Sequence, residues 1–262
     1  MATDGGGVDD DTEEKEELDP DLLKKIQERY MPVRPDKLYS FETISFGDTA
    51  VDLYCLHHVM SWENVELGEA VWPSAKILSR YLLDNPDLVR DVSVLELGCG
   101  PGLTGLVAAK LSRQPSRVLL TDNCQLVLEE LVPRSIQHNF PHTEDRPECV
   151  YLHWGADLPR FQQKYGSFDV ILGADVIYWT EYVEPLLQTV SQLLSLKPSS
   201  SFITIYEERY LKAPDTTVPE MLNIAHKYNL TCSNIPLENN PEYQEARKQK
   251  RNFKLYSFMR KS

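Results

Sequence analysis

A glycine-rich segment in the middle of the chain is a candidate ligand-binding turn. It follows a short apolar run, and its distinctive residues are Glu96, Gly98, Cys99, Gly100 and Gly102. Glycine is needed where a backbone turns sharply or lets a ligand approach without a Cβ in the way. An apolar strand that passes through such a turn into a helix is typical of sheets that bind nucleotides. The segment therefore predicts a site for a ligand that contains a nucleoside.

An acidic residue, Asp122, follows the next apolar run. A carboxylate at that position can accept hydrogen bonds from both hydroxyls of a ribose. The spacing of Gly100, Gly102 and Gly105 matches the dinucleotide fingerprint, whereas the run from Glu96 to Gly102 matches the S-adenosylmethionine loop, Glu/Asp-x-Gly-x-Gly-x-Gly. A tight turn that binds nothing would also use glycines. Glu96 favours S-adenosylmethionine, because a carboxylate suits its cationic amino-acid end but would oppose a pyrophosphate, and no Tyr-x-x-x-Lys of the short-chain dehydrogenases is present.

The elements that would position these residues alternate along the chain. Short apolar runs predict strands, and the amphipathic stretches between them predict helices. We expect strands at 92–97, 117–121, 149–154, 168–173, 201–206, 230–237 and 252–259, and helices at 75–83, 102–111, 124–139, 181–196 and 218–228. This alternation predicts an α/β fold, a mostly parallel seven-stranded sheet with helices on both faces. Such sheets bind ligands at the carboxyl ends of their strands, where the glycines and Asp122 would lie.

The ends of the chain differ in charge from its middle. Residues 1–17 hold eight acids against one lysine and predict a disordered acidic tail. Residues 18–67 predict an N-terminal extension, with a capped helix at 21–30 and a β-hairpin of 38–46 and 49–56 around Gly47-Asp48. Residues 68–262 would form the ligand-binding domain. Residues 242–262 hold seven Lys or Arg against two acids, and we expect a solvated loop that leads into the last strand, with a binding patch as the alternative.

Composition excludes several classes of protein. The 262 residues carry a formal net charge of −13, which argues against a general nucleic-acid binder and suits a basic protein partner. No apolar stretch approaches the ~20 residues of a membrane helix, and the N-terminus lacks the pattern of a secretory signal. The five cysteines form no Cys-x-x-Cys pair, so a zinc site of common spacing is excluded, and no metal is expected. These features predict reduced thiols in a cytoplasmic or nuclear protein, which we expect to be a monomer.

Four further segments complete a resemblance to a known family. They are Trp72-Pro73 upstream of the glycines, Leu120-Thr-Asp122, Trp154-Gly155, and the run from Leu172 to Tyr178, which includes Asp-Val-Ile-Tyr. In order and spacing the chain resembles the seven-β-strand methyltransferases, specifically the Asp-x-x-Tyr protein-lysine group called methyltransferase family sixteen. The resemblance covers roughly residues 38–260. It departs from the usual family loop at Cys99 and Pro101, where Ala or Thr is common.

The resemblance implies a Rossmann-like class I methyltransferase fold and S-adenosyl-L-methionine as the cofactor. Its cofactor contacts would be Trp72, Glu96, Gly98, Cys99, Gly100, Gly102, Asp122, Trp154 and Ala174. Asp175 and Tyr178 would lie beside the transferred methyl group, where Tyr178 would supply an apolar wall and a hydroxyl that aligns the amine. A lysine must react as a neutral amine, although its free pKa is about 10.4. Asp175 would first attract the charged ammonium. Partial desolvation and the sulfonium charge would then favour the neutral amine. A simpler role for Asp175 is a cap for the next helix.

The function implied is methylation of a lysine of a protein substrate, with the lysine in a basic segment. Two alternatives remain at this point. A methyltransferase of this kind could act on a protein histidine, a protein terminus or a small molecule. A non-catalytic adaptor could keep the fold and the ligand. An exocyclic adenine nitrogen is disfavoured, because its methylases carry Asn/Asp-Pro-Pro-Tyr where this chain has Asp-Val-Ile-Tyr.

Overall fold

A computed structural model of the chain describes residues 39–56, 67–177, 180–208 and 217–261. The chain divides into two compact units, of which Tyr39–Ser262 contains all of these residues. The acidic tail, the expected helix at 21–30 and the expected catalytic Tyr178 lie outside the described residues. The domain boundary expected between residues 67 and 68 stays a prediction.

The predicted hairpin is confirmed. β1 (Tyr39–Phe46) and β2 (Thr49–Leu56) pair antiparallel around Gly47, whose φ of +66° suits a glycine in this two-residue turn. Side chains of α4 (Val132–Asn139) bind the backbone of β2. The Asn139 side chain accepts from the Asp52 N–H at 3.2 Å and donates to the Asp52 carbonyl at 2.6 Å. Side chains of α4 therefore form hydrogen bonds with backbone groups of β2, as a neighbouring strand would.

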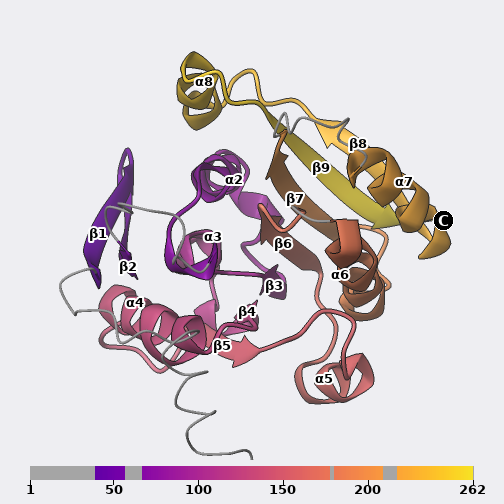
Figure 1. Cartoon of the computed structure of the whole chain (residues 1–262). Helices are drawn as coiled ribbons and strands as arrows, with labels where there is room; N and C mark the ends of the chain where they lie inside the picture. Colours follow the sequence, from indigo (N-terminus) through magenta and orange to yellow (C-terminus); the bar gives the residue numbers. More distant parts are fainter. Residues whose placement is uncertain (1–38, 57–66, 178–179, 209–216, 262) are drawn as a thin grey trace, which may run out of the picture. The chain divides into compact units, whose positions relative to one another are not determined.

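The seven-stranded sheet is also confirmed. Its strand order is β5-β4-β3-β6-β7-β9-β8 (Figure 1). The five strands from β5 to β7 pair in parallel, and β9 pairs antiparallel with both β7 and β8. The strands are β3 (Val94–Leu97), β4 (Val118–Asp122), β5 (Glu148–Tyr151), β6 (Val170–Ala174), β7 (Ser201–Glu207), β8 (Leu230–Ile235) and β9 (Phe253–Arg260). Parallel strands place their carboxyl ends at one edge, where β3, β4 and β6 deliver the glycine loop, Asp122 and Asp175.

Helices cover both faces of this sheet, as the alternation predicts (Figure 1). One apolar core joins α2, α3 and α4 to the hairpin and one face of the strands, and a second joins α5, α6 and α7 to the other face. Alternate strand residues enter each core, as the two-residue period of a strand requires. The helices are α2 (Pro73–Asp84), α3 (Leu103–Leu111), α5 (Leu158–Tyr165), α6 (Thr180–Leu193), α7 (Thr217–Lys227) and α8 (Pro241–Lys248).

Three expectations about local structure need correction. Neither α5 nor α8 is predicted from the sequence, and the loop expected between residue 242 and the last strand is largely α8, whereas the last strand itself is confirmed as β9. The strand expected to reach Trp154 ends at Tyr151. The helix expected over 124–139 contains a π-helical turn, Val127–Leu131, before α4. Pro133 has no N–H to donate to the residue four before it, which favours such a change of register.

Candidate active site

A cavity of about 690 Å³ lies at the carboxyl edge of the sheet. This volume is in the range of about 300–1,000 Å³ that is typical of small-molecule sites. Its wall contains most of the predicted site residues, namely Trp72, Glu96, Gly98, Cys99, Gly100, Asp122, Trp154, Ala174 and Asp175. Gly102 is not in this wall and instead begins α3, and Tyr178 lies outside the described residues.

The glycine loop brings a tryptophan close to the backbone. Gly98 has a φ of +61°, which L-residues with a side chain rarely adopt. A Cβ at this position would lie 3.0 Å from Val176 and 3.3 Å from the Trp154 ring. The following residue, Cys99, is buried, and burial raises the pKa of its thiol well above the usual range. The loop therefore offers backbone and apolar surface to a ligand, and the Cys99 thiol stays neutral.

Glu96 ties the end of β3 to the first turn of α3. Its Oε2 accepts from the Gly105 N–H at 2.8 Å. A Cβ at Gly105 would lie 2.5 Å from that oxygen and 2.7 Å from Leu120 Cγ. This glycine is therefore required for close approach of the helix to β3 and β4.

Replacing Gly105 with alanine should destabilise the fold by about 2–4 kcal/mol, the range for overpacking combined with loss of a buried hydrogen bond. The added methyl group must push α3 away from Glu96 and Leu120. Urea denaturation of wild type and Gly105→Ala measures the change. A free energy of unfolding within about 0.5 kcal/mol of wild type, the range of neutral surface changes, would contradict this account of Gly105.

The charge state of Glu96 depends strongly on its surroundings. Burial raises the pKa of Glu96 to about 8, the hydrogen bond from Gly105 lowers it in part, and the charge of Asp122 raises it further. At neutral pH the carboxyl group of the cofactor-free protein is therefore largely protonated. A cation bound beside it would favour the ionised form.

The free energy of unfolding of the cofactor-free protein should decrease as pH rises, because of Glu96. Its folded-state pKa of about 8 exceeds its usual value of 4.5, so the folded protein binds more protons than the unfolded chain in that window. This stabilisation is complete below pH 4.5 and is lost as pH rises through 8. Glu96→Gln cannot titrate, so its advantage over wild type should grow across the window to the order of a few kcal/mol. Urea denaturation at several pH values checks this, and parallel stability curves would contradict it.

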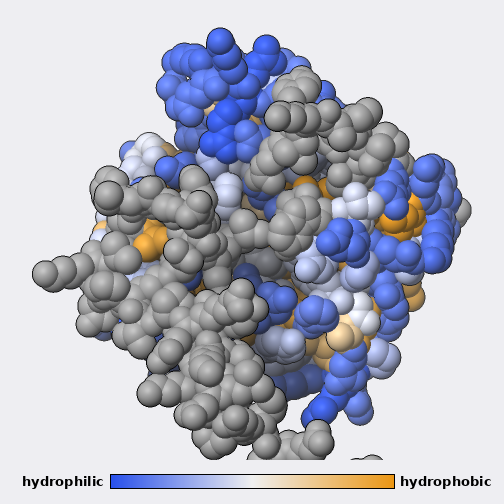
Figure 2. Space-filling view, viewed as in Figure 1, coloured by the Kyte–Doolittle hydropathy of each residue, from blue (hydrophilic) through white to orange (hydrophobic). Residues whose placement is uncertain are grey.

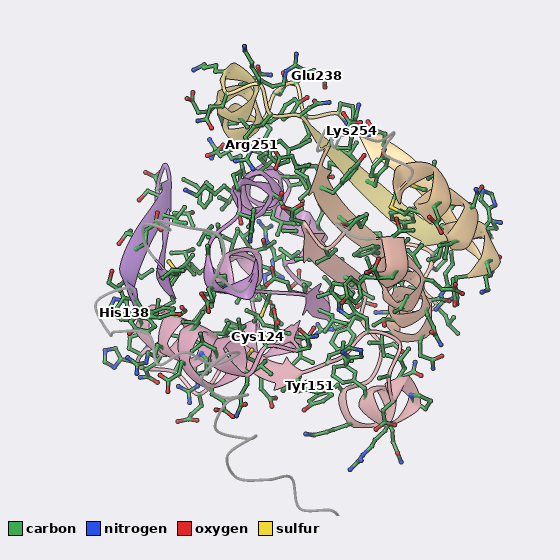
Figure 3. All side chains as sticks on the ribbon, viewed as in Figure 1. Cys124, His138, Tyr151, Glu238, Arg251 and Lys254 are labelled. Carbon is green, nitrogen blue, oxygen red and sulfur yellow. The ribbon has the colours of Figure 1, made fainter. Side chains whose placement is uncertain are left out.

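Asp122 ends β4 with its carboxylate held by backbone amides. Its Oδ2 accepts from the Gly100 N–H at 3.0 Å, and its Oδ1 accepts from the N–H groups of Asn123 at 2.8 Å and Cys124 at 3.0 Å. The residue is 8% exposed. Cys124 also lines the cavity and lies near the middle of the molecule in Figure 3. The three amides fix the carboxylate in the cavity wall.

The two predicted tryptophans reach the cavity from different elements. Trp72 precedes Pro73, the first residue of α2, and has extended backbone geometry. Trp154 lies beyond the end of β5 rather than within it. Both residues are half-buried and line the cavity. They supply flat apolar surface to the cavity.

Asp175 directly follows β6 and has an unusual backbone conformation. Its φ is +60°, a left-handed conformation that Asp tolerates better than most residues and that is often found at functional sites. Its N–H donates to the Ile205 carbonyl of β7 at 2.8 Å, which fixes its position. Val176 and Ile177, which follow Asp175, are not helical, so Asp175 is not the N-cap of α6. The simpler role considered for Asp175 is therefore wrong.

The charge of the cavity fits a cationic ligand. Four carboxylic residues line it, Glu96, Asp122, Asp175 and Glu181, and its described wall includes no Lys or Arg. S-adenosylmethionine carries a sulfonium, an ammonium group and an apolar adenine, which these carboxylates and tryptophans suit. A pyrophosphate would be repelled by those of the four that are ionised. The residues present therefore fit S-adenosylmethionine better than a dinucleotide.

Some residues of the wall were not expected from the sequence. The cavity is also lined by three residues of α6, Glu181, Tyr182 and Pro185, and by Ala70 and Val71 before Trp72. Their only local signal is proximity to an expected motif, because nothing in their spacing indicates which way a helix turns its first residues.

Within the described ranges, no group of three or more His, Cys, Asp or Glu is arranged to hold a metal ion. No helix in the described part of the chain is long and apolar enough to cross a membrane.

Comparisons with known proteins agree with this geometry. Residues 55–222, more than half of the chain, match the family described as Lysine methyltransferase. Protein N-lysine methyltransferase METTL21A of Mus musculus is 33% identical over 181 residues, which cover 64% of this chain and 78% of that protein. Histone-arginine methyltransferase METTL23 of Xenopus laevis is 32% identical over 177 residues, which cover 67% of this chain and 70% of that protein.

A solved structure shares the fold. The 16S rRNA methyltransferase RsmC of T. thermophilus, in complex with AdoMet and guanosine, superposes with a TM-score of 0.51 at 17% identity. The match covers 86% of this chain and 51% of that chain. At this level of identity the likeness concerns the arrangement of strands and helices.

Proposed function

The chain belongs to the lysine methyltransferase family, and we propose that the cavity at the carboxyl edge of its sheet is where a methyl group passes from S-adenosylmethionine to a lysine of a protein substrate. The observation that carries this assignment is a wall with four carboxylic residues and a glycine loop next to Asp175. Bound S-adenosylmethionine would supply an electrophilic methyl group. The contacts that bind and orient the cofactor and the lysine would come from the backbone and side chains of this chain.

Three groups of residues would hold the cofactor. Asp122 would accept hydrogen bonds from the ribose hydroxyls, since three backbone amides hold its carboxylate in the cavity wall. Trp72 and Trp154 would pack against the adenosine. Glu96 and the loop from Gly98 to Gly100 would face the amino-acid end, while Gly102 sets the start of α3. Ala174 is small enough to leave room beside the reacting centre.

Asp175 would receive the lysine. Its carboxylate attracts the incoming ammonium, which then releases a proton to solvent water and becomes a neutral amine, because the partly desolvated pocket also holds a cationic cofactor. Most of the rate enhancement would come from alignment of the amine with the methyl group. Tyr178 as an aligning hydroxyl stays a prediction, because it lies outside the described residues.

The partner and setting follow from charge and thiol chemistry. A net charge of −13 and carboxylates at the cavity support a lysine in a basic segment of the substrate. All five cysteines are free, which supports a reducing compartment, the cytoplasm or the nucleus. We propose that the chain acts as a monomer.

Labelling with a deuterated methyl donor tests the acceptor. Purified protein and S-adenosylmethionine with a trideuterated methyl group are incubated with a cell lysate, and labelled peptides are identified by mass spectrometry. The label should appear on lysine and should be lost with Asp175→Ala. METTL23 is named for arginine, so label on arginine instead would overturn the lysine assignment. Absence of both label and calorimetric binding of S-adenosylmethionine would overturn the function.

A further inference from the structure

The connection between β8 and β9 lies at the same edge of the sheet as the active site. β9 runs antiparallel to β7, and Phe253 at its start pairs with Glu207 at the carboxyl end of β7. β8 ends at Ile235, which pairs with Leu255 close to the same start. The intervening residues, including α8, therefore lie at the edge of the sheet that carries Asp175. Figure 1 shows α8 at the top of the molecule, beyond the ends of β7 and β9.

Several polar contacts hold this connection in place. Arg251 donates two hydrogen bonds to the Glu207 carboxylate, at 2.7 and 2.6 Å. The Asn240 side chain donates to the Ile77 carbonyl of α2 at 3.0 Å. The charge of Asp175 also raises the pKa of Arg251, after the larger effect of Glu207, which indicates that the connection reaches the neighbourhood of the lysine site. The connection is thus anchored to both β7 and α2.

This anchored connection carries a concentration of positive charge. Residues 247–254 contain Arg247, Lys248, Lys250, Arg251 and Lys254 and no acid, in a chain of net charge −13. Arg247, Lys248 and Lys250 are exposed. Hydrophilic side chains gather over α8 in Figure 2, and Figure 3 places Arg251 and Lys254 in the same upper part of the molecule. We call Arg247, Lys248 and Lys250 the basic corner.

Local structure holds these cations at the surface, where the Arg247 guanidinium lies over the Tyr243 ring and donates to its hydroxyl at 3.3 Å. Lys250 occupies the left-handed position after α8, with a φ of +61°, where glycine is usual. Its N–H donates to the Arg247 carbonyl at 2.9 Å, and the Arg251 N–H donates to the Ala246 carbonyl at 3.1 Å. Lys248 contacts Glu245 at 2.7 Å, an exposed pair of small net energy that a ligand can replace. A lysine in place of glycine at this turn keeps a third charge on the surface.

We propose that the basic corner docks an acidic segment of the substrate protein while its lysine enters the cavity. The proposal rests on the proposed function. The substrate would then be polarised, basic where it faces Glu181 at the cavity and acidic where it passes α8. A nucleic acid fits less well, because three exposed cations are few against the roughly 6–10 phosphate contacts of a typical nucleic-acid binder, and the remaining surface is acidic.

Labelled peptides test the docking. Each of two fluorescent peptides contains a single lysine with three identical residues on each side of it. These flanking residues are glutamate in one peptide and serine in the other, and the peptides are otherwise identical. Wild type should bind the glutamate peptide about tenfold more tightly at low salt, as expected for three exposed ion pairs, and high salt should remove the difference. The variant with Arg247→Ser, Lys248→Ser and Lys250→Ser should lose the preference in fluorescence anisotropy.

A matched variant separates local from global charge. Arg113→Ser, Arg117→Ser and Arg146→Ser remove the same charge from exposed residues near the opposite edge of the sheet, and the preference should survive. A preference that persists in the basic-corner variant, or its absence in wild type, overturns the docking. Tighter binding of a labelled single-stranded oligonucleotide than of the glutamate peptide overturns it as well. Calorimetry with S-adenosylmethionine tells the two proposals apart, since failure of that binding in wild type counts against the proposed function.

Discussion

Replacing Asp122 with alanine should weaken the binding of S-adenosylmethionine by about a hundredfold or more. Asp122 is the one carboxylate at the end of β4, and three backbone amides fix it in the cavity wall. Two hydrogen bonds from ribose hydroxyls to a charged acceptor are worth about 1.5–3 kcal/mol each. The substitution also removes the acceptor of the Gly100 N–H, so the glycine loop loses a brace on the side that faces the ligand. Isothermal titration calorimetry measures the change directly.

A second buried aspartate provides the control for this experiment. Asp169 is 5% exposed, accepts from Ser195 at 3.0 Å, and precedes β6 at the opposite edge of the sheet. Asp169→Asn should cost stability without changing the affinity for S-adenosylmethionine. Equal affinity of wild type and Asp122→Ala would show that Asp122 only braces the loop. Selective binding of NAD by wild type would overturn the cofactor assignment altogether.

The parts of the site that could be predicted share a local signal. The glycines of the loop and Asp122 stand next to apolar runs, so the strand that carries each of them is readable from composition alone. Once those strands are parallel, their carboxyl ends meet at one edge, and the residues that follow them come together. Trp72 lies next to no such strand, and only the resemblance to a family indicated it. The structure places it at the start of α2, in the wall of the same cavity.

The short helices escaped prediction for a physical reason. α5 and α8 have eight residues each, which is little more than two turns and too short for a hydrophobic period to stand out. α5 buries only Leu158 and Phe161, and α8 buries only Tyr243 and Ala246. Tertiary packing of these few side chains stabilises helices that would be marginal in isolation. The basic residues after 242 are evident in the sequence, but without α8 their placement in the basic corner could not be predicted.

Contacts between segments that are distant in the sequence could not be predicted either. Arg251 and Glu207 are 44 residues apart in the sequence and meet because β9 returns antiparallel to β7. The direction of the last strand is not encoded in its composition, so neither partner is recognisable beforehand. The bond between Glu96 and Gly105 escaped for a related reason. Both residues belong to a recognised motif, but the motif assigns Glu96 to the ligand, whereas the structure also binds it to α3.

Replacing Asp175 with asparagine should lower the rate of methyl transfer by about a hundredfold to a thousandfold, while the affinity for S-adenosylmethionine changes little. Asparagine has the shape of aspartate and also tolerates the left-handed conformation, with its φ of +60° in this chain. The backbone bond to Ile205 should therefore persist. What disappears is the negative charge that attracts the lysine, and losing one partner of a desolvated ion pair costs about 2–5 kcal/mol. Incorporation of a labelled methyl group into the substrate measures the rate.

Asp157 offers a matched control, because it has the same unusual backbone without the same setting. Its φ is +47°, its side chain is exposed before α5, and it does not line the cavity. Asp157→Asn should retain the full rate, so a loss confined to Asp175→Asn cannot come from the backbone conformation. If Asp175→Asn also keeps the full rate, the carboxylate does not receive the lysine. In that case the negative charge of the cavity would serve the cofactor alone, and lysine binding would depend on residues outside the described ranges.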